Sequence, residues 1–433
     1  MKNINLLHLK NINSYEWGQR FFLFGLFFLC SSIFISGLFL IPAFLISTFS
    51  IQRKKNYFKD TWNLSFFICG ILIITNAVLQ RFFLLNNFEG IWEPSLSIIG
   101  LANWIPFFWI FWASQPYLNS PQKRKTFALI LISGTFPLII TGFGQFFFHW
   151  NGPFETLNGL IIWFQRPIEV PGGLSGLFSS QNYAGSWLNL VWPFCIALLI
   201  EKSEGIFKNT VSMCFFFSIG FATFLTYSRN AWAGLLISIP IVLGVEGSIW
   251  IIIFIVSLIF IIFLSSTFFS GEIQKFFLNI IPERIILEFT EKGYEGLDIT
   301  RIEILKSALK IINIRPLIGV GAAAFTAIFR SQTTFYKGHS HNLLTELAIS
   351  YGIPVTFIFG ITIITIIITS FFRIFLKNSS IKKVDFYERA IWASTFFFFL
   401  SQLTDIQYFD GKLAILIWLL LASLRNINEE RKV

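Results

Sequence analysis

Residues 21–50 read FFLFGLFFLCSSIFISGLFLIPAFLISTFS and contain no charged side chain. An apolar helix of about 20 residues is enough to cross a bilayer, so this run is too long for a single crossing. Ser36-Gly37 and Pro42 favour a division into two short helices, over 21–34 and 37–50. The sequence therefore predicts that the chain opens with a pair of short membrane helices.

Comparable apolar runs recur along the rest of the chain. The 433 residues are 55% hydrophobic and only 13% charged, a composition that a water-soluble domain could not bury in one core. We therefore expect an all-α, polytopic membrane protein of about 12 transmembrane helices that forms a single domain over residues 1–433. Beyond the first pair, the predicted spans are 62–80, 98–118, 126–147, 183–200, 211–228, 231–246, 249–268, 343–372, 388–405 and 412–425.

Clusters of lysine and arginine fall in alternate connections between these spans. The positive-inside rule places such clusters in the cytoplasm, together with both termini when the spans number twelve. The net charge of +10 is thus explained by orientation in a membrane, and no nucleic-acid partner is expected. The clusters are Arg53 to Lys55, Lys123 to Lys125, Lys202 with Lys208, Arg373 to Lys383, and Arg425 to Lys432.

The opposite side receives one long connection, residues 269–342. A connection of this length is usually functional, so we expect a helical extracytoplasmic loop that carries the active site. Its first part, 271–300, holds six acidic and three basic residues, whereas 301–338 holds six basic residues and one acidic residue. The basic part suits an anionic ligand such as a lipid diphosphate, and a solvated helix face is the alternative.

Two histidines end this loop, in the stretch GHSHNLLTELAISYG (338–352). Because histidine titrates near neutral pH, His339 or His341 can remove a proton from a hydroxyl nucleophile. Asn342 and Glu346 can orient a ring or cap the following helix. The alternative is that the imidazoles only form hydrogen bonds at a membrane interface. A zinc site needs three or four ligands, and only His149 and loop carboxylates remain on this side, so no metal is expected.

Arg229, in LTYSRNAWAGL, lies between two apolar runs with almost no loop. Such an arginine is held at the membrane face, where its planar fork matches phosphate oxygens. The alternative is an arginine that reaches the lipid headgroups.

Arg301 opens the stretch RIEILKSALKIINIRPLIGVGAAAF. Apolar residues recur there at helical spacing, which predicts an amphipathic helix that ends at Arg315-Pro316, followed by a turn at Gly319-Val320-Gly321. The apolar residues are Ile302, Leu305, Leu309 and Ile312.

Arg166 precedes a glycine-rich stretch, PGGLSGLFSSQNYAG (171–185), that leads Gln181-Asn182 into the next span. Irregular backbone at membrane depth is tolerated only where it is buried in protein or lines a cavity. Arg166 and Asn182 are therefore candidate supporting residues. Ser175 acting with His341 would instead suit an intramembrane serine protease.

Taken in this order, GLFSSQNYAG, YSRNAWAG, TRIEILKSALKIINIRPLIGVGAAAF and HSHNLLTELAISYG resemble the motifs of the O-antigen ligase/polymerase superfamily. The resemblance runs from about residue 166 to 360, and Gln181-Asn182 stands where the family usually has proline-asparagine. It implies glycosyl transfer without metal or cofactor at the periplasmic face of the bacterial inner membrane, among membrane lipids. The donor would be a glycan on undecaprenyl diphosphate.

The resemblance also implies roles for individual residues. His341 would deprotonate the acceptor hydroxyl, while Arg229 and Arg301 would bind the diphosphate. His339 would be a partner of His341 or a contact to sugar. Apart from the resemblance, Asn342, Arg166, Arg315 and Asn182 are candidate supporting residues. The acceptor would be another glycan for a polymerase, or lipid A core or a different acceptor for a ligase. A transporter of small anions such as bicarbonate is the alternative from another class, although no internal repeat is found and the ionisable residues gather at one face.

Overall fold

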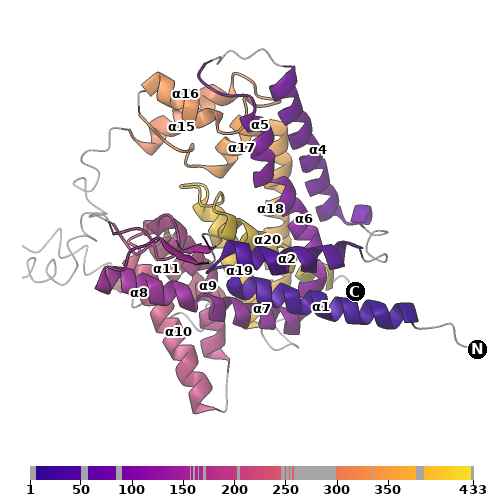
Figure 1. Cartoon of the computed structure of the whole chain (residues 1–433), viewed down its shortest axis with the longest axis vertical. Coiled ribbons are helices and arrows are strands. Elements are labelled where there is room, and N and C mark those ends of the chain that lie inside the picture. Colours follow the sequence, from indigo (N-terminus) through magenta and orange to yellow (C-terminus); the bar gives the residue numbers. More distant parts are fainter. Residues whose placement is uncertain are drawn as a thin grey trace, which may run out of the picture.

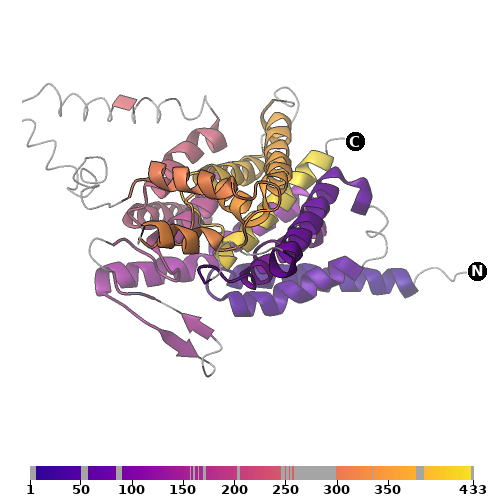
Figure 2. The same ribbon diagram turned by 90° about the horizontal axis from the view of Figure 1, so that it is seen from above.

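The chain is helical through most of the residues that the computed structural model describes, and the predicted all-α class is confirmed (Figure 1). The exception within them is a small antiparallel hairpin of β1 (Phe154–Thr156) and β2 (Ile161–Trp163), which projects from the helical body (Figure 2). The described residues are 6–49, 57–83, 90–156, 158, 161–163, 165–168, 172–201, 205–244, 249, 253, 256–257, 299–333, 335–376 and 385–430.

The helices follow the apolar runs of the sequence. They are α1 (Leu6–Phe28), α2 (Ile33–Phe49), α4 (Thr61–Phe82), α5 (Leu96–Ile99), α6 (Ile105–Ser114), α7 (Pro121–Gly134), α8 (Phe136–Phe148), α9 (Gln181–Ile200), α10 (Ile206–Leu225), α11 (Arg229–Leu243), α15 (Arg301–Ile312), α16 (Ala324–Thr333), α17 (Leu343–Tyr351), α18 (Ile353–Phe371), α19 (Phe386–Ser401) and α20 (Gly411–Glu430).

Within the described part of the chain, seven helical segments are long and apolar enough to cross a membrane, and α2 and α11 are shorter apolar helices. The predicted span 249–268 lies almost entirely outside the described residues, so the count of twelve stays a prediction. The seven segments are Thr61–Phe82, Leu96–Leu118, Pro121–Phe148, Gln181–Ile200, Ile206–Leu225, Ile353–Leu376 and Gly411–Glu430.

The run 21–50 divides between two helices, as predicted, but the first begins at Leu6 and not at residue 21, and the break lies earlier than expected. α1 ends at Phe28, and the Ser32 hydroxyl accepts a hydrogen bond from Ile35 N (3.3 Å) at the start of α2. Ser36 instead ties the pair together, because its hydroxyl donates to the Gly25 carbonyl (2.8 Å). Pro42 lies inside α2 without ending it, which membrane helices tolerate.

Three helices, α15, α16 and α17, form a small layer, called the cap below, that lies beside the upper ends of the tall helices α4 and α18 (Figure 1). The cap has a hydrophobic core of its own, separate from that of the helical bundle. The predicted amphipathic helix is present as α15, but Ile302, Leu305 and Leu309 face outward and are exposed. The face that packs in the cap consists of Ile304, Ala308, Ile311 and Ile312.

The cap is joined to the bundle where the predicted span 343–372 breaks in two. Gly352 has a φ of 92°, and the Leu317 carbonyl leaves no room for a Cβ there, so α17 ends and α18 begins. The break frees carbonyl groups at the end of α17. Side chains of α4 satisfy two of them, because Asn76 donates to the Tyr351 carbonyl (2.7 Å) and Gln80 to the Ser350 carbonyl (2.9 Å).

Ion pairs gather at the end of the bundle opposite the cap. Arg124 is fully buried and binds both Glu388 and Glu430, which joins α7 to α19 and α20. Nearby, Lys125 pairs with Glu201 and Arg425 pairs with Asp60. The basic clusters within the described segments therefore lie at one end, as predicted; that this end faces the cytoplasm stays a prediction.

Arg124→Met tests this network. It would leave the buried Glu388 carboxylate without its cation, and we expect a loss of stability of about 3–5 kcal/mol. Lys125→Met is the matched control, because both partners of the Lys125–Glu201 pair are more than a quarter exposed, so its loss should change stability little. Thermal unfolding of both purified variants measures the difference. Equal melting temperatures would contradict a structural role for Arg124.

Candidate active site

The turn that carries the two histidines is fixed by the start of α17. Asn342 caps this helix, because its side-chain oxygen accepts from Leu344 N (2.9 Å) and Thr345 N (3.2 Å). The buried Glu346 carboxylate accepts from Ser340 N (2.9 Å). His341 itself has a φ of 55°, in the left-handed region that non-glycine residues rarely adopt. Asn342 thus acts as a cap, and neither Asn342 nor Glu346 is the hydrogen-bond partner found for the His341 ring.

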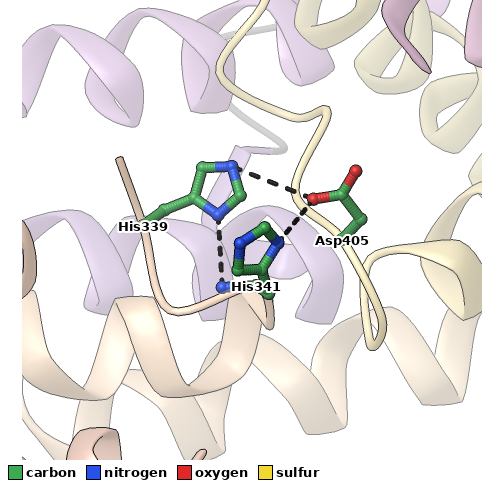
Figure 3. Close-up of side chains that lie close together, drawn as sticks. All are labelled: His339, His341 and Asp405. Carbon is green, nitrogen blue, oxygen red and sulfur yellow. Dashed lines mark hydrogen bonds and ion pairs between the residues drawn. The ribbon is translucent and has the colours of Figure 1, made fainter. Parts of the chain in front are cut away.

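That partner is Asp405, on the loop between α19 and α20 (Figure 3). His341 Nδ1 lies 2.9 Å from Asp405 Oδ1. The Asp405 side chain is about one-tenth exposed, whereas the His341 side chain is about one-quarter exposed. The carboxylate is therefore sheltered, and the ring reaches the surface of the site.

The hydrogen bond assigns the protons on His341. Burial by itself would raise the pKa of Asp405, but the hydrogen bond from His341 and the nearby His341, His339 and Arg301 bring the pKa below its ordinary value. An ionised carboxylate only accepts hydrogen bonds, so Nδ1 of His341 carries the proton. Nε2 then keeps its lone pair, and His341 is arranged to act as a base through that atom.

His339 is held against His341. Its Nδ1 accepts a hydrogen bond from His341 N (3.2 Å), and the two ring centroids are 4.6 Å apart (Figure 3). Burial lowers the pKa of His339 to about 4, and the neighbouring His341 acts in the same direction. His339 is therefore neutral at physiological pH, and with Nδ1 as an acceptor its proton is on Nε2.

The second carboxylate oxygen of Asp405 is anchored from the bundle. Asn182, in the first turn of α9, donates to Oδ2 (3.1 Å), and Gln407 donates to the same oxygen (3.0 Å). The backbone N–H of Ile406 donates to Oδ1 (3.1 Å). These bonds orient the carboxylate toward His341 and bring the predicted residue Asn182 into contact with the site.

Arg301 reaches the same loop from the cap. Its Nη1 donates to the Thr404 carbonyl (2.6 Å), one residue before Asp405. The Thr404 hydroxyl in turn pairs with the Asn230 side chain (3.2 Å), next to Arg229. Arg229 is the first residue of α11 and is exposed, as is Arg301. Residues 404–405 thus contact Arg301, the histidine pair and Asn230, which is the chain neighbour of Arg229.

Two other predicted arginines occupy different places. Arg315 follows the far end of α15, a helix about 18 Å long at 1.5 Å per residue, so it lies away from Arg301. Arg166 is exposed, and its carbonyl accepts a hydrogen bond from Gln145 (2.6 Å).

The O-Antigen ligase family matches residues 214–360, from α10 into α18, a range that includes both arginines and both histidines. The match confirms the predicted resemblance to the O-antigen ligase-like superfamily. No curated protein matches the chain. Asp405 and Asn182 lie outside the O-antigen ligase match and are brought to it by the fold.

The glycine-rich stretch before α9 is buried as predicted, but its serine is otherwise engaged. Gln145 of α8 accepts from Ser175 N (3.0 Å) and Gly176 N (2.8 Å), and it donates to the Ser175 hydroxyl (2.9 Å). Gly173 N donates to the Gln181 side chain. Ser175 therefore serves to hold the loop, and its contacts do not favour the serine protease alternative.

Sequence reasoning missed Asp405 as a site residue. It stands among polar residues between two apolar runs, on the same predicted side as His341, which is the signal that could have identified it. His339, His341 and Asp405 together place three ligand-type atoms within 4.8 Å of one another. Asp405 is thus the carboxylate that joins the two histidines, whereas His149 is not part of this group.

Gln145→Leu tests how the loop beside this O-antigen ligase-like segment is held. It removes the partner of two backbone amides and the Ser175 hydroxyl, and each unsatisfied buried group costs about 1–3 kcal/mol. We expect a lower melting temperature and faster proteolysis within residues 166–180. Gln122→Leu, at an exposed position of α7, is the control. Unchanged proteolysis in Gln145→Leu would contradict this role.

Proposed function

We propose that the protein is a glycosyltransferase of the bacterial inner membrane. It transfers a glycan from undecaprenyl diphosphate to an acceptor hydroxyl at the periplasmic face, without metal or cofactor, and both termini are cytoplasmic. The O-antigen ligase match supports this class of reaction. Residues 269–342 belong to the periplasmic part of the single membrane domain.

One observation carries the proposal. Adjacent residues, Thr404 and Asp405, hold a cation and a base side by side: Arg301 binds the Thr404 carbonyl (2.6 Å), and His341 binds Asp405 (2.9 Å). A transfer from a lipid diphosphate needs both groups, because one oxygen must lose a proton while another gains negative charge.

The reaction would proceed as a single displacement. His341 Nε2 takes the proton of the acceptor hydroxyl as its oxygen attacks the anomeric carbon. The bond from that carbon to the diphosphate oxygen breaks, and its electron pair leaves with the polyprenyl diphosphate. Arg229 and Arg301 stabilise the developing charge, and Asp405 stabilises the imidazolium. The anomeric configuration inverts.

The acceptor distinguishes the two forms of this activity. A ligase delivers the glycan to lipid A core or a different acceptor, and a polymerase delivers it to another lipid-linked glycan. Purified protein supplied with the lipid-linked donor, each acceptor and a chelator tests both. Product formed in the presence of chelator supports the proposal. The acceptor that receives the glycan then shows whether the protein is a ligase or a polymerase. No product with any acceptor would overturn it.

His341→Ala should lower kcat by about 10²–10⁴-fold, the usual contribution of a general base.

Asp405→Asn should lower kcat by about 10²-fold and shift the pH profile while leaving the KM for donor nearly unchanged, because Asp405 positions the ring and does not touch the donor. His149→Ala, at an exposed histidine, is the control. A pH profile in Asp405→Asn identical to that of the wild type would contradict the positioning role.

Arg301→Gln should weaken binding of polyprenyl diphosphate by about 10–100-fold, since a hydrogen bond to a charged group contributes about 1.5–3 kcal/mol. Arg315→Gln is the matched comparison on the same segment, because Arg315 lies beyond the far end of α15. Its effect should be smaller, less than about fivefold, the upper end for an ion pair that water screens. Binding measured without acceptor reports this difference, and equal losses in the two variants would contradict the assignment.

A further inference from the structure

Two imidazoles and one carboxylate converge in the site. His341 Nδ1 lies 2.9 Å and His339 Nε2 lies 3.9 Å from the same oxygen, Asp405 Oδ1, and all three atoms lie within 4.8 Å of one another (Figure 3). Histidine nitrogen and aspartate oxygen are preferred ligands of Zn²⁺, and three such ligands with an open fourth position form a common zinc arrangement.

We infer that His339, His341 and Asp405 form an inhibitory site for a transition-metal dication such as Zn²⁺. This inference rests on the function proposed above, because the inhibition acts on that glycosyl transfer. The metal would be a regulator that competes with the active arrangement of the site.

Holding the ion requires the three ligand atoms, which now lie within 4.8 Å of one another, to draw together, with the largest movement between the two imidazoles. Zinc ligands at 2.0–2.1 Å from a tetrahedral metal are about 3.3 Å apart. The Asp405–His341 separation would open slightly from 2.9 Å, and the Asp405–His339 separation would close slightly from 3.9 Å. Both imidazole side chains are about one-fifth to one-quarter exposed, so an ion can enter from the surface.

The surroundings of Asp405 also suit a metal ligand. Asn182 and Gln407 both donate to Oδ2, which leaves Oδ1 directed toward the histidines. Hydrogen bonds of this kind, from residues that do not touch the metal, orient ligands and strengthen binding. The carboxylate is thus already held in place before an ion arrives.

Binding would rearrange protons within the pair of histidines. The Nδ1 proton of His341 would move to Nε2, and the Nε2 proton of His339 would move to Nδ1, so no net proton is released. His339 would give up the 3.2 Å hydrogen bond from His341 N. Nε2 of His341 would then be a donor, and the base would be lost.

Calorimetric titration of the chelator-stripped full-length protein with ZnCl₂ tests the site. We expect one equivalent to bind to the wild type and to His149→Ala, the control at an exposed histidine. Asp405→Asn and His339→Gln should weaken binding by more than about 100-fold, beyond the effect of losing an orienting hydrogen bond. No binding to the wild type, or unchanged binding in both variants, would overturn the inference.

Two further measurements separate this inference from the proposed function. Visible absorption of Co²⁺ bound to the wild type should report nitrogen and oxygen ligands without relying on any variant, and a spectrum of the hydrated ion alone would count against the site.

Zinc should inhibit transfer by the wild type over the concentration range in which it binds. Zinc that binds but stimulates transfer would overturn the inhibitory role. Failure of the proposed function would appear instead as no transfer by the chelated protein.

Discussion

The site depends on the hydrogen bond between His341 and Asp405, two residues 64 positions apart in the chain. One partner belongs to the turn that starts α17 in the cap, and the other to the loop between α19 and α20. The bond therefore fixes the cap against the bundle at the same point where it fixes the tautomer of His341. Arg301 reinforces this junction by binding Thr404 from α15. The contact between His341 and Asp405 thus fixes both where the base lies and which of its nitrogens carries the proton.

Hydrogen bonds to the backbone at the break between α17 and α18 also hold the cap against the membrane helices. The break at Gly352 would leave carbonyl groups unpaired next to apolar surroundings, where they are costly. Asn76 and Gln80 of α4 supply the missing donors, and Ile353 N donates to the Pro316 carbonyl (2.7 Å). Asn76 and Gln80, two polar residues within the apolar helix α4, therefore connect the cap to the bundle.

Features that depend on local pattern were predictable from the sequence, and those that depend on pairing were not. Hydropathy located most helices, and loop charge placed His341, Arg229 and Arg301 at one end. The capping role of Asn342 also follows from its place before an apolar run. Asp405 carries no local signature, because only the fold brings it to His341. The prediction of which face of α15 is buried was wrong for the same reason. Apolar residues recur at helical spacing on both its exposed and its packed face, so their spacing alone does not tell the two faces apart.

A double-mutant cycle measures directly whether Asp405 acts through His341. Transfer rates would be compared for wild type, His341→Ala, Asp405→Asn and the double variant. We expect that Asp405→Asn lowers the rate no further once His341 is absent, because the effects of residues that act as a unit are not additive. Independent effects, with the double variant slower by the product of the two single losses, would contradict it.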